Sequence, residues 1–369
     1  MSLSRRKMLS IIGGGTIVAA AGGAGAFLTT RTPKKALAPW SAAGTYSDPR
    51  RNALSHALLA PNPHNRQPWL VDLDTPEVID LYRDKSKDLP HTDPFSRQLT
   101  IGMGCFIELM VMAAAQTGHA VELALFPDGE DGPVARAHLV ESGAEPDPLF
   151  AAVQHRRSCK EPFEARPVTP EHAALLEPFA DLITAPEKVS ELIELTWSAW
   201  KVEVETPRTY KESVDLMRIG KAEINAQPDG IDLGGPFLSS LALLGQLSRE
   251  GQLDQTSSQY TQGVAVYEEM LHATPAYAAL TSASNQRTDQ IEAGRRWLRL
   301  NLAATTHGLA LHPVSQCLQE YPEMRHHYDR AHELLAPEGH TVQMLGRLGY
   351  GPTTPHSPRW PLEAKIIDT

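Results

Sequence analysis

Apolar and polar positions along the first part of the chain follow two different periods, which predict a short helix, a hairpin and a long central helix. Apolar residues recur at helical spacing over 48–59, and a nearly uncharged apolar run follows over 102–118. Two short apolar runs bounded by turn residues, 70–73 and 78–82, predict a hairpin. A helix that is apolar all round is buried, so 102–118 is expected to lie in the core.

The remaining elements are predicted from the same patterns. Alternating apolar positions predict strands over 120–126 and 135–140, and a strand over 343–351 ends in glycine. Helices are expected over 170–179, where Thr169-Pro170-Glu171 is a favourable start, over 185–200, and over the leucine-rich run 237–247. Strands and helices that are mixed in this way predict an α+β chain.

A set of small residues recurs at a constant offset of 190 positions. Gly104, Ala113, Ala114 and Gly118 of the first apolar helix correspond to Gly294, Ala303, Ala304 and Gly308. Small residues allow two helices to pack closely, and a glycine just past each helix is a typical C-cap. Chance is the alternative, because alanine and glycine are common. The repeat otherwise predicts two related halves with a central helix in each.

The first 38 residues have the composition of an export leader. Residues 1–35 contain six basic and no acidic residues, and the apolar run Ile11–Leu28 is long enough to span a bilayer. The sequence Ser4-Arg5-Arg6-Lys7-Met8-Leu9 reads as a twin-arginine signal. Ala36-Leu37-Ala38 has the form of a cleavage site, although Pro39 after it is unfavourable. A chance Arg-Arg pair is the alternative, and release or tethering stays open.

Removing the leader changes the charge of the chain. Lys plus Arg falls from 34 to 28 while Asp plus Glu stays at 44, which gives a net charge of −16. An acidic chain lacks the basic footprint of a nucleic-acid-binding protein. Cys105, Cys159 and Cys317 show no metal-ligand spacing and are expected to be buried thiols. No metal site is therefore expected.

The loop Ala60–Trp69, with the sequence APNPHNRQPW, is the first candidate site. Its three prolines fix φ and bar a helix, so Asn62, Pro63, His64, Asn65 and Gln67 belong to a rigid loop. The plain alternative is a polar surface turn. Amide and imidazole groups that end in a tryptophan offer donors, acceptors and an aromatic wall, a mixture that suits a planar heteroaromatic ligand.

A basic segment opens the second half and is the second candidate site. It runs from His155 to Phe163, with the sequence HRRSCKEPF, and guanidinium groups beside a serine hydroxyl suit a phosphate. Taken alone, such a run is usually a solvated surface. The first half has only Pro49-Arg50-Arg51-Asn52 at the corresponding place, so its own site is expected to be degenerate.

These segments together resemble the nitroreductase superfamily, whose FMN lies between two subunits of an α+β dimer. The loop resembles its N-x-Q-P-W motif and 156–163 its R-R-S-x-R-x-F segment, with Lys160 in place of the usual arginine. Residues 308–313 resemble its G-L-x-x-x-P stretch, and 358–361 its closing P-R-x-P. Ser315 and Gln316 stand where many relatives have Glu-Gly. The Acg-like branch, with two halves fused in one chain, is the most similar.

The resemblance implies an organisation for the whole chain. It implies an α+β, nitroreductase-like fold in which two halves form an intramolecular pseudo-dimer with central helices and flanking antiparallel-containing sheets. After the leader, 1–38, the first half would cover 45–150. The second would cover 151–369 and include a helical insertion, about 206–287, that lies over the flavin as a lid. The alternative for this insertion is a helical addition that only enlarges the core.

The resemblance also implies a composite FMN site. The first half would supply Asn62, Pro63, His64, Asn65 and Gln67, and the second half would supply Arg156, Arg157, Ser158, Lys160, Gly308, Pro313, Val314, Ser315 and Arg359. Backbone amides near 313–315 would contact the flavin ring. Arg359, with Arg156 or Arg157, would complete a cationic phosphate site.

The expected function is that of an exported, FMN-dependent oxidoreductase that passes electrons to a nitro, quinone or similar small acceptor. Its partners would be this acceptor, an electron donor that the sequence does not name, and the twin-arginine export machinery. It would be a monomer, because the pseudo-dimer is internal, and it would be periplasmic or tethered to the membrane. An FMN-storing protein without turnover and an exported scaffold without flavin are the alternatives.

Overall fold

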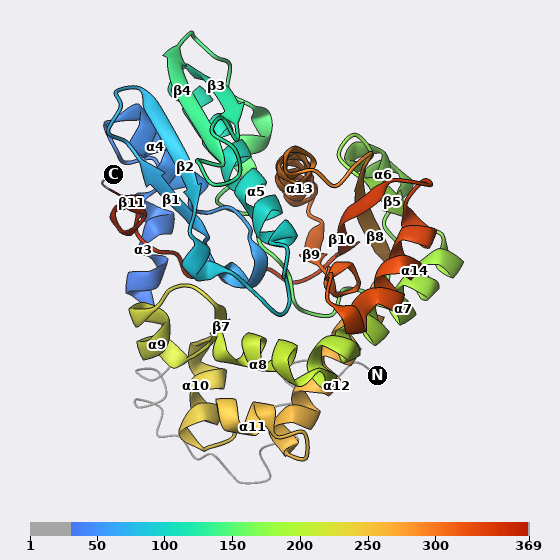
Figure 1. Ribbon diagram of the computed structural model, residues 1–369. Coiled ribbons are helices and arrows are strands. Elements are labelled where there is room, and N and C mark those ends of the chain that lie inside the picture. Colours follow the sequence, from blue (N-terminus) through green and yellow to red (C-terminus); the bar gives the residue numbers. More distant parts are fainter. Residues whose placement is uncertain (1–30, 368–369) are drawn as a thin grey trace.

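The computed structural model describes residues 31–367, so the twin-arginine motif lies outside the described residues. Two antiparallel-containing sheets stand on either side of two long helices, α5 and α13, and a mostly helical insertion covers one end of the molecule (Figure 1). The fold is therefore α+β, with two halves arranged as a pseudo-dimer inside one chain, as predicted.

The first half is built from a helix pair, a hairpin, the central helix and a second hairpin. Its elements are α3 (Lys34–Ala42), α4 (Pro49–Ala57), β1 (Trp69–Asp72), β2 (Val78–Arg83), α5 (Arg97–Ala115), β3 (His119–Leu125) and β4 (Ala135–Glu141). Asp48 caps α4 by accepting from the N–H groups of Arg50 and Arg51. The predicted hairpin and strands are confirmed, whereas α5 begins earlier than predicted.

The second half repeats this order. Its elements are α6 (Pro170–Leu176), β5 (Asp181–Ile183), β8 (Ala276–Ser282), α13 (Arg287–Thr306), β9 (Ala310–Pro313), α14 (Arg325–Leu335), β10 (Thr341–Gly349) and β11 (Ile366–Ile367). The sheet orders are β11-β1-β2-β4-β3 and β5-β8-β10-β9, so four strands correspond one to one. β11 pairs in parallel with β1, and the end of the second half thus completes the sheet of the first.

The two central helices cross at the glycines of the repeat. A Cβ atom on Gly104 would lie 2.1 Å from the carbonyl oxygen of Ile291, and one on Gly294 would lie 2.0 Å from that of Ile101. Each glycine thus meets the backbone of the opposite helix, and the two contacts are related by the 190-residue offset. The small residues were predicted for close helix packing, and the structure confirms it.

Two ion pairs obey the same offset. Arg97 contacts Glu320 with an N–O distance of 3.3 Å, and Arg287 contacts Glu130 at 3.2 Å. Both arginines begin a central helix, and both carboxylates lie past the strand that follows the other helix. A chance repeat of small residues does not produce reciprocal contacts. Sequence comparison at this offset could have found these four residues.

The insertion joins β5 to β8 and differs from its predicted extent. It contains α7 (Pro186–Glu205), α8 (Pro207–Asp215), β6 (Met217–Ile219), α9 (Gly220–Ala226), β7 (Ile231–Leu233), α10 (Gly235–Leu243), α11 (Arg249–Leu253) and α12 (Ser258–His272). The predicted range of 206–287 is wrong at its C-terminal end, because β8 is a central strand of the second sheet. It also omits α7, which packs beside α8 and α12.

Buried thiols and a buried apolar helix complete the core. Cys105, Cys159 and Cys317 are buried, as expected. α5 is the one described helix long and apolar enough to cross a membrane, and 83% of that segment is buried within the protein. Together with its packing against α13, this burial identifies α5 as a core helix.

Candidate functional site

The predicted loop has a tightly wound backbone. His64, Asn65 and Gln67 all have positive φ, at 47°, 51° and 50°, a conformation that is uncommon for residues other than glycine. The Oδ1 atom of Asn62 accepts from the N–H of Gln67 at 2.7 Å and thereby closes the loop on itself. Such strain concentrates where the surrounding structure holds it, which is often at functional sites.

Trp69 does not serve as the aromatic wall that the sequence predicted. Its side chain is fully buried, and its ring lies 4.8 Å from that of Phe106 on α5. The strand that follows the loop directs this residue into the core of the first half, so the prediction of a ligand-facing tryptophan is wrong. Trp69 instead fixes the loop to the central helix.

Residues from both halves meet at the first turns of α5. Gly102 leaves room for the loop, because a Cβ atom there would lie 3.1 Å from the Cβ of Asn62 and 3.2 Å from the Cδ of Pro63. One turn earlier, Gln98 accepts a hydrogen bond of 3.1 Å from the hydroxyl of Ser315. Positions four apart share a helix face, so the loop and the segment after β9 converge there.

The basic segment 156–160 runs beside β9 and approaches the same place. Ser158 forms a parallel bridge with Leu311, and the N–H of Cys159 donates to the carbonyl of Leu311 at 3.1 Å. Gly308 lies at the turn between α13 and β9, with φ of 70°, and Pro313 ends β9 opposite Gly346. β9 thus carries the segment 313–316 alongside the serine and lysine.

Arg359 is directed toward the loop backbone. Its Nε donates to the carbonyl of Leu58 at 2.7 Å, and its Nη2 atom donates to those of Leu59 and Ala60. Nη1 contacts the Oδ1 of Asn65 at 2.7 Å as well as Ser357 and Pro358. Burial lowers the pKa of this guanidinium to about 9. Arg359 therefore holds the loop in place, while its predicted contact with phosphate stays a prediction.

The two neighbouring arginines differ in burial and in the number of hydrogen bonds that they make with the described residues. Arg156 is buried and donates to the carbonyl of Leu59 at 2.9 Å, and burial lowers its pKa to about 10. Arg157 is half-buried and contacts the carbonyls of Thr354, Gln154 and Arg156 through Nε and Nη1. Its Nη2 has no hydrogen-bond partner among the described residues.

The positive charge of Lys160 is the electrostatic centre of the site, because it acts on His64 and on two other titratable groups. Burial lowers the pKa of His64 to about 4, with a further contribution from the positive charge of Lys160. The same charge contributes to the lowered pKa of His312 and opposes the rise that burial causes for Asp232. Lys160 thus lies within electrostatic range of His64 from the first half and Asp232 from the insertion, and its own side chain is exposed.

Several polar groups around this centre have no hydrogen-bond partner among the described residues. These are the side chains of His64, Ser158 and Lys160, and the backbone N–H groups of Ser315 and Gln316 at the start of a short 3₁₀ helix, η4 (Gln316–Leu318). The N–H of Val314 is instead paired with Leu345 at 2.9 Å. Unpaired donors at a helix start favour a ligand that accepts hydrogen bonds.

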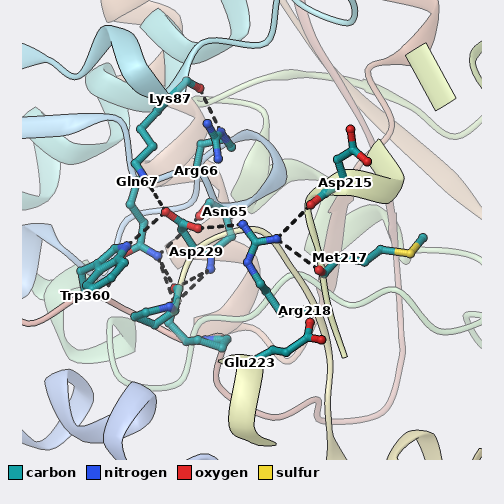
Figure 2. A network of polar contacts seen from close by, with 12 residues as sticks. Asn65, Arg66, Gln67, Lys87, Asp215, Met217, Arg218, Glu223, Asp229 and Trp360 are labelled. Carbon is teal, nitrogen blue, oxygen red and sulfur yellow. Dashed lines mark hydrogen bonds and ion pairs between the residues drawn. The ribbon is translucent and has the colours of Figure 1, made fainter. Parts of the chain in front are cut away.

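A buried acidic residue that the sequence analysis did not predict for the site joins the insertion to Lys87 of the first half and to Trp360 of the C-terminal segment. Figure 2 shows Asp229 among Lys87, Arg218 and Trp360, with Nζ of Lys87 at 2.5 Å and Nη2 of Arg218 at 3.2 Å. Its side chain is fully buried, and the hydrogen bonds from Lys87 and Trp360 help to hold its pKa below the usual value against the effect of burial.

Backbone groups on either side of Asp229 complete this connection. The carbonyl of Pro228 accepts from Nε2 of Gln67 at 2.6 Å, and the N–H of Gly230 donates to the carbonyl of Asn65 at 3.2 Å. Gln67 also accepts from the N–H of Trp360 at 2.9 Å. Asn65 and Gln67 therefore join the insertion to the C-terminal segment, and the Pro-Asp-Gly sequence was the only available signal for this turn.

Arg50 of the first half has a structural role. Its Nη1 donates to the carbonyls of Leu73, Thr75 and Val78, which close the β1–β2 turn. A guanidinium used in this way is not directed at a second ligand site. That the first half lacks a complete site of its own stays a prediction.

The pKa of His64 predicts how stability depends on pH. Because the folded-state pKa, about 4, lies below the ordinary value of 6.5, the unfolded chain binds more protons between these values, and stability falls as pH falls through this window. His64→Gln should therefore show a weaker loss of stability from pH 6.5 to pH 4 than the wild type, measured by urea unfolding. Equal slopes for both proteins would contradict this assignment.

Comparison with known proteins gives partial similarities. No family model matches the chain. Over 133 residues it is 31% identical to a protein described as "Putative NAD(P)H nitroreductase" in two strains of Mycobacterium tuberculosis, and the alignment covers 34% of this chain. The chain thus spans 37% of the length of the curated relatives it matches.

Two solved structures are also similar. The FMN-dependent nitroreductase NfnB from Mycobacterium smegmatis, in complex with NADPH, is 17% identical, with a TM-score of 0.37 and coverage of 60% of this chain and 98% of that one. A "putative nitroreductase" from Anabaena variabilis is 13% identical, with a TM-score of 0.41 and coverage of 80% and 82%.

Proposed function

We propose that this chain is an FMN-dependent oxidoreductase of nitroreductase type, in the Acg-like arrangement of two fused halves, and that it is exported by the twin-arginine route. Its acceptor would be a small nitro, quinone or similar compound. The observation that supports this most directly is the convergence of unpaired polar groups from both halves, His64 from the first and Ser158, Lys160, Ser315 and Gln316 from the second. The partial identity with a nitroreductase sequence agrees with it.

The residues present suit the flavin's oxygen and nitrogen acceptors. Lys160 supplies a positive charge, the hydroxyl of Ser158 and the backbone N–H groups of Ser315 and Gln316 supply neutral donors, and Arg157 has one free nitrogen. FMN, when bound, supplies the electron transfer. His64 is neutral near pH 7 because its pKa is about 4, so it can hydrogen bond without adding a second positive charge beside Lys160.

The rigid surroundings explain how these groups are held. Arg359 and Arg156 fix the carbonyls of 58–60, and Gln67 and Asn65 tie the loop to the insertion and to the C-terminal segment. Groups positioned by a packed scaffold bind a ligand without a further ordering cost. In this proposal the two buried arginines support the site, while Lys160 and Arg157 supply the charge for the phosphate or the ring.

Reoxidation of the bound flavin distinguishes an enzyme from an FMN store. The purified protein is reduced with dithionite under argon, and menadione or nitrofurazone is then added while absorbance near 450 nm is followed. We expect acceptor-dependent reoxidation, with rates that saturate as the acceptor concentration rises. Reoxidation no faster than that of the same concentration of free reduced FMN would favour storage and contradict turnover.

A further inference from the structure

The predicted cleavage motif of the leader belongs to the folded domain. Ala36-Leu37-Ala38 lies within α3, and Ala36 is 1% exposed. The N–H of Ala36 donates to Oδ1 of Asn225 on α9 at 3.0 Å, and its carbonyl accepts from the N–H of Arg359 at 2.8 Å. This motif is therefore held in a helix by contacts with both the insertion and the C-terminal segment.

Trp40 connects the same helix to the candidate site. Its Nε1 donates to the carbonyl of Ser357 at 2.8 Å, its ring stacks on that of His356 with centroids 3.9 Å apart, and the guanidinium of Arg157 lies over it. Cleavage after Ala38 would remove the first five residues of α3. These include Ala36, whose carbonyl accepts from the N–H of Arg359. The end of the predicted leader is thus part of the scaffold that holds the loop.

Proteases cut exposed, flexible chain rather than packed helices. A protein carried by the twin-arginine route is already folded when it meets the signal peptidase, so α3 would protect the motif. We infer that the leader is retained and that the apolar segment Ile11–Leu28 holds the folded chain at the membrane, with α10 of the insertion resting on the bilayer surface. This inference rests on the export proposed above and goes beyond the proposed reaction.

α10 has the composition expected of a helix that contacts lipid. It has the sequence GPFLSSLAL, in which Ser239 is buried, Leu243 is exposed and the other seven residues are half-buried. Leu243 and the following Leu244 are each 71% exposed, the highest values among the large apolar side chains of the described residues. Apolar side chains that gather on one surface mark an interaction site.

The position of α10 supports the bilayer as the surface that this helix contacts. α9 packs against both α3, where the leader joins the domain, and α10 (Figure 1). Lys34 and Lys35 begin α3, are exposed, and suit anionic lipid headgroups. An anchor that enters the domain at α3 therefore brings the neighbouring α10 close to the membrane.

Retention of the leader is tested by expressing the full chain in a bacterium that has a twin-arginine translocase. We expect the protein in the membrane fraction after alkaline carbonate extraction, with an intact mass that includes Ile11–Leu28. Pro39→Ala removes the unfavourable residue after the motif and should still retain the leader, because α3 protects it. A soluble protein that begins at residue 39, or after Leu28, would overturn the inference.

A matched control separates this result from a failure of export. Arg5→Lys with Arg6→Lys should leave the chain inaccessible to protease added outside spheroplasts, whereas the wild type should be digested. If the wild type is also inaccessible, the export on which the inference rests is wrong, while FMN binding by the same protein is unaffected.

The contact of α10 is tested by a dye attached to a single introduced cysteine. The three native cysteines are buried, so Leu243→Cys can be labelled selectively, and Leu175→Cys on α6, whose leucine is 45% exposed, serves as the control. In vesicles of phosphatidylethanolamine, phosphatidylglycerol and brominated phosphatidylcholine, we expect quenching at 243 and little at 175. Equal quenching at both positions, or none at either, would overturn the contact.

Discussion

Replacing Gly294 with alanine is expected to lower the free energy of unfolding by about 3 to 5 kcal/mol. Its Cβ would lie 2.0 Å from the carbonyl oxygen of Ile101 and 2.8 Å from the Cα of Gly104, and both are backbone atoms that move only if α5 and α13 separate. The separation would spread through the interface between the two halves. Urea unfolding followed by circular dichroism measures the change.

A second helical glycine provides the control. Gly263 lies in α12, and a Cβ atom there would contact only the flexible side chain of Gln252, at 3.3 Å. Gly263→Ala should be neutral or should stabilise the protein by up to about 1 kcal/mol, because alanine is the better helix former. If Gly294→Ala behaves in the same way as Gly263→Ala, the close crossing of the central helices is wrong.

Replacing Asp229 with alanine is expected to lower the free energy of unfolding by about 3 kcal/mol. The change leaves the cations of Lys87 and Arg218 without their shared carboxylate, and their side chains are only 17% and 8% exposed. It also removes the acceptor of the Trp360 indole. The segment 228–230 should then separate from the loop more readily.

Limited proteolysis distinguishes this local effect from general destabilisation. Cleavage within the insertion should become faster in Asp229→Ala at temperatures where the wild-type and variant cores both remain folded. Asp254→Ala is the control, because Asp254 is exposed at the end of α11 and only caps a local turn. If both variants are cleaved at the same rate, Asp229 does not fasten the insertion.

The local spacing of apolar residues and the repeated small residues were enough to predict the two halves and their central helices. The 102–118 run carries one charged residue, Glu108, so it was expected to be a core helix, and the offset that relates Gly104 to Gly294 predicted the crossing itself. The extent of the insertion was predicted wrongly, because α7 has the spacing of an ordinary amphipathic helix and because β8 is buried continuously over 276–280 and so shows no alternation.

The sequence indicated which segments lie near one another more readily than it indicated the contacts of their side chains. The proline-rich loop and the basic segment do converge, but the partner of each side chain depends on distant backbone. Arg359 looked like a phosphate ligand, and only the fold reveals that the carbonyls of 58–60 surround it. Similarly, Asp229 resembles an ordinary turn residue until Lys87, 142 positions earlier in the chain, is brought beside it.

The most direct test is the visible spectrum and released chromophore of the full chain purified after folding in the cytoplasm. The wild type is compared with Ser158→Ala/Lys160→Gln and with Lys188→Gln, a surface lysine on α7. The proposed composite site predicts stoichiometric FMN in the wild type and in Lys188→Gln, and its loss from the double variant with the fold unchanged. A colourless wild type that also fails to bind added FMN, or a double variant that retains FMN fully, would contradict it.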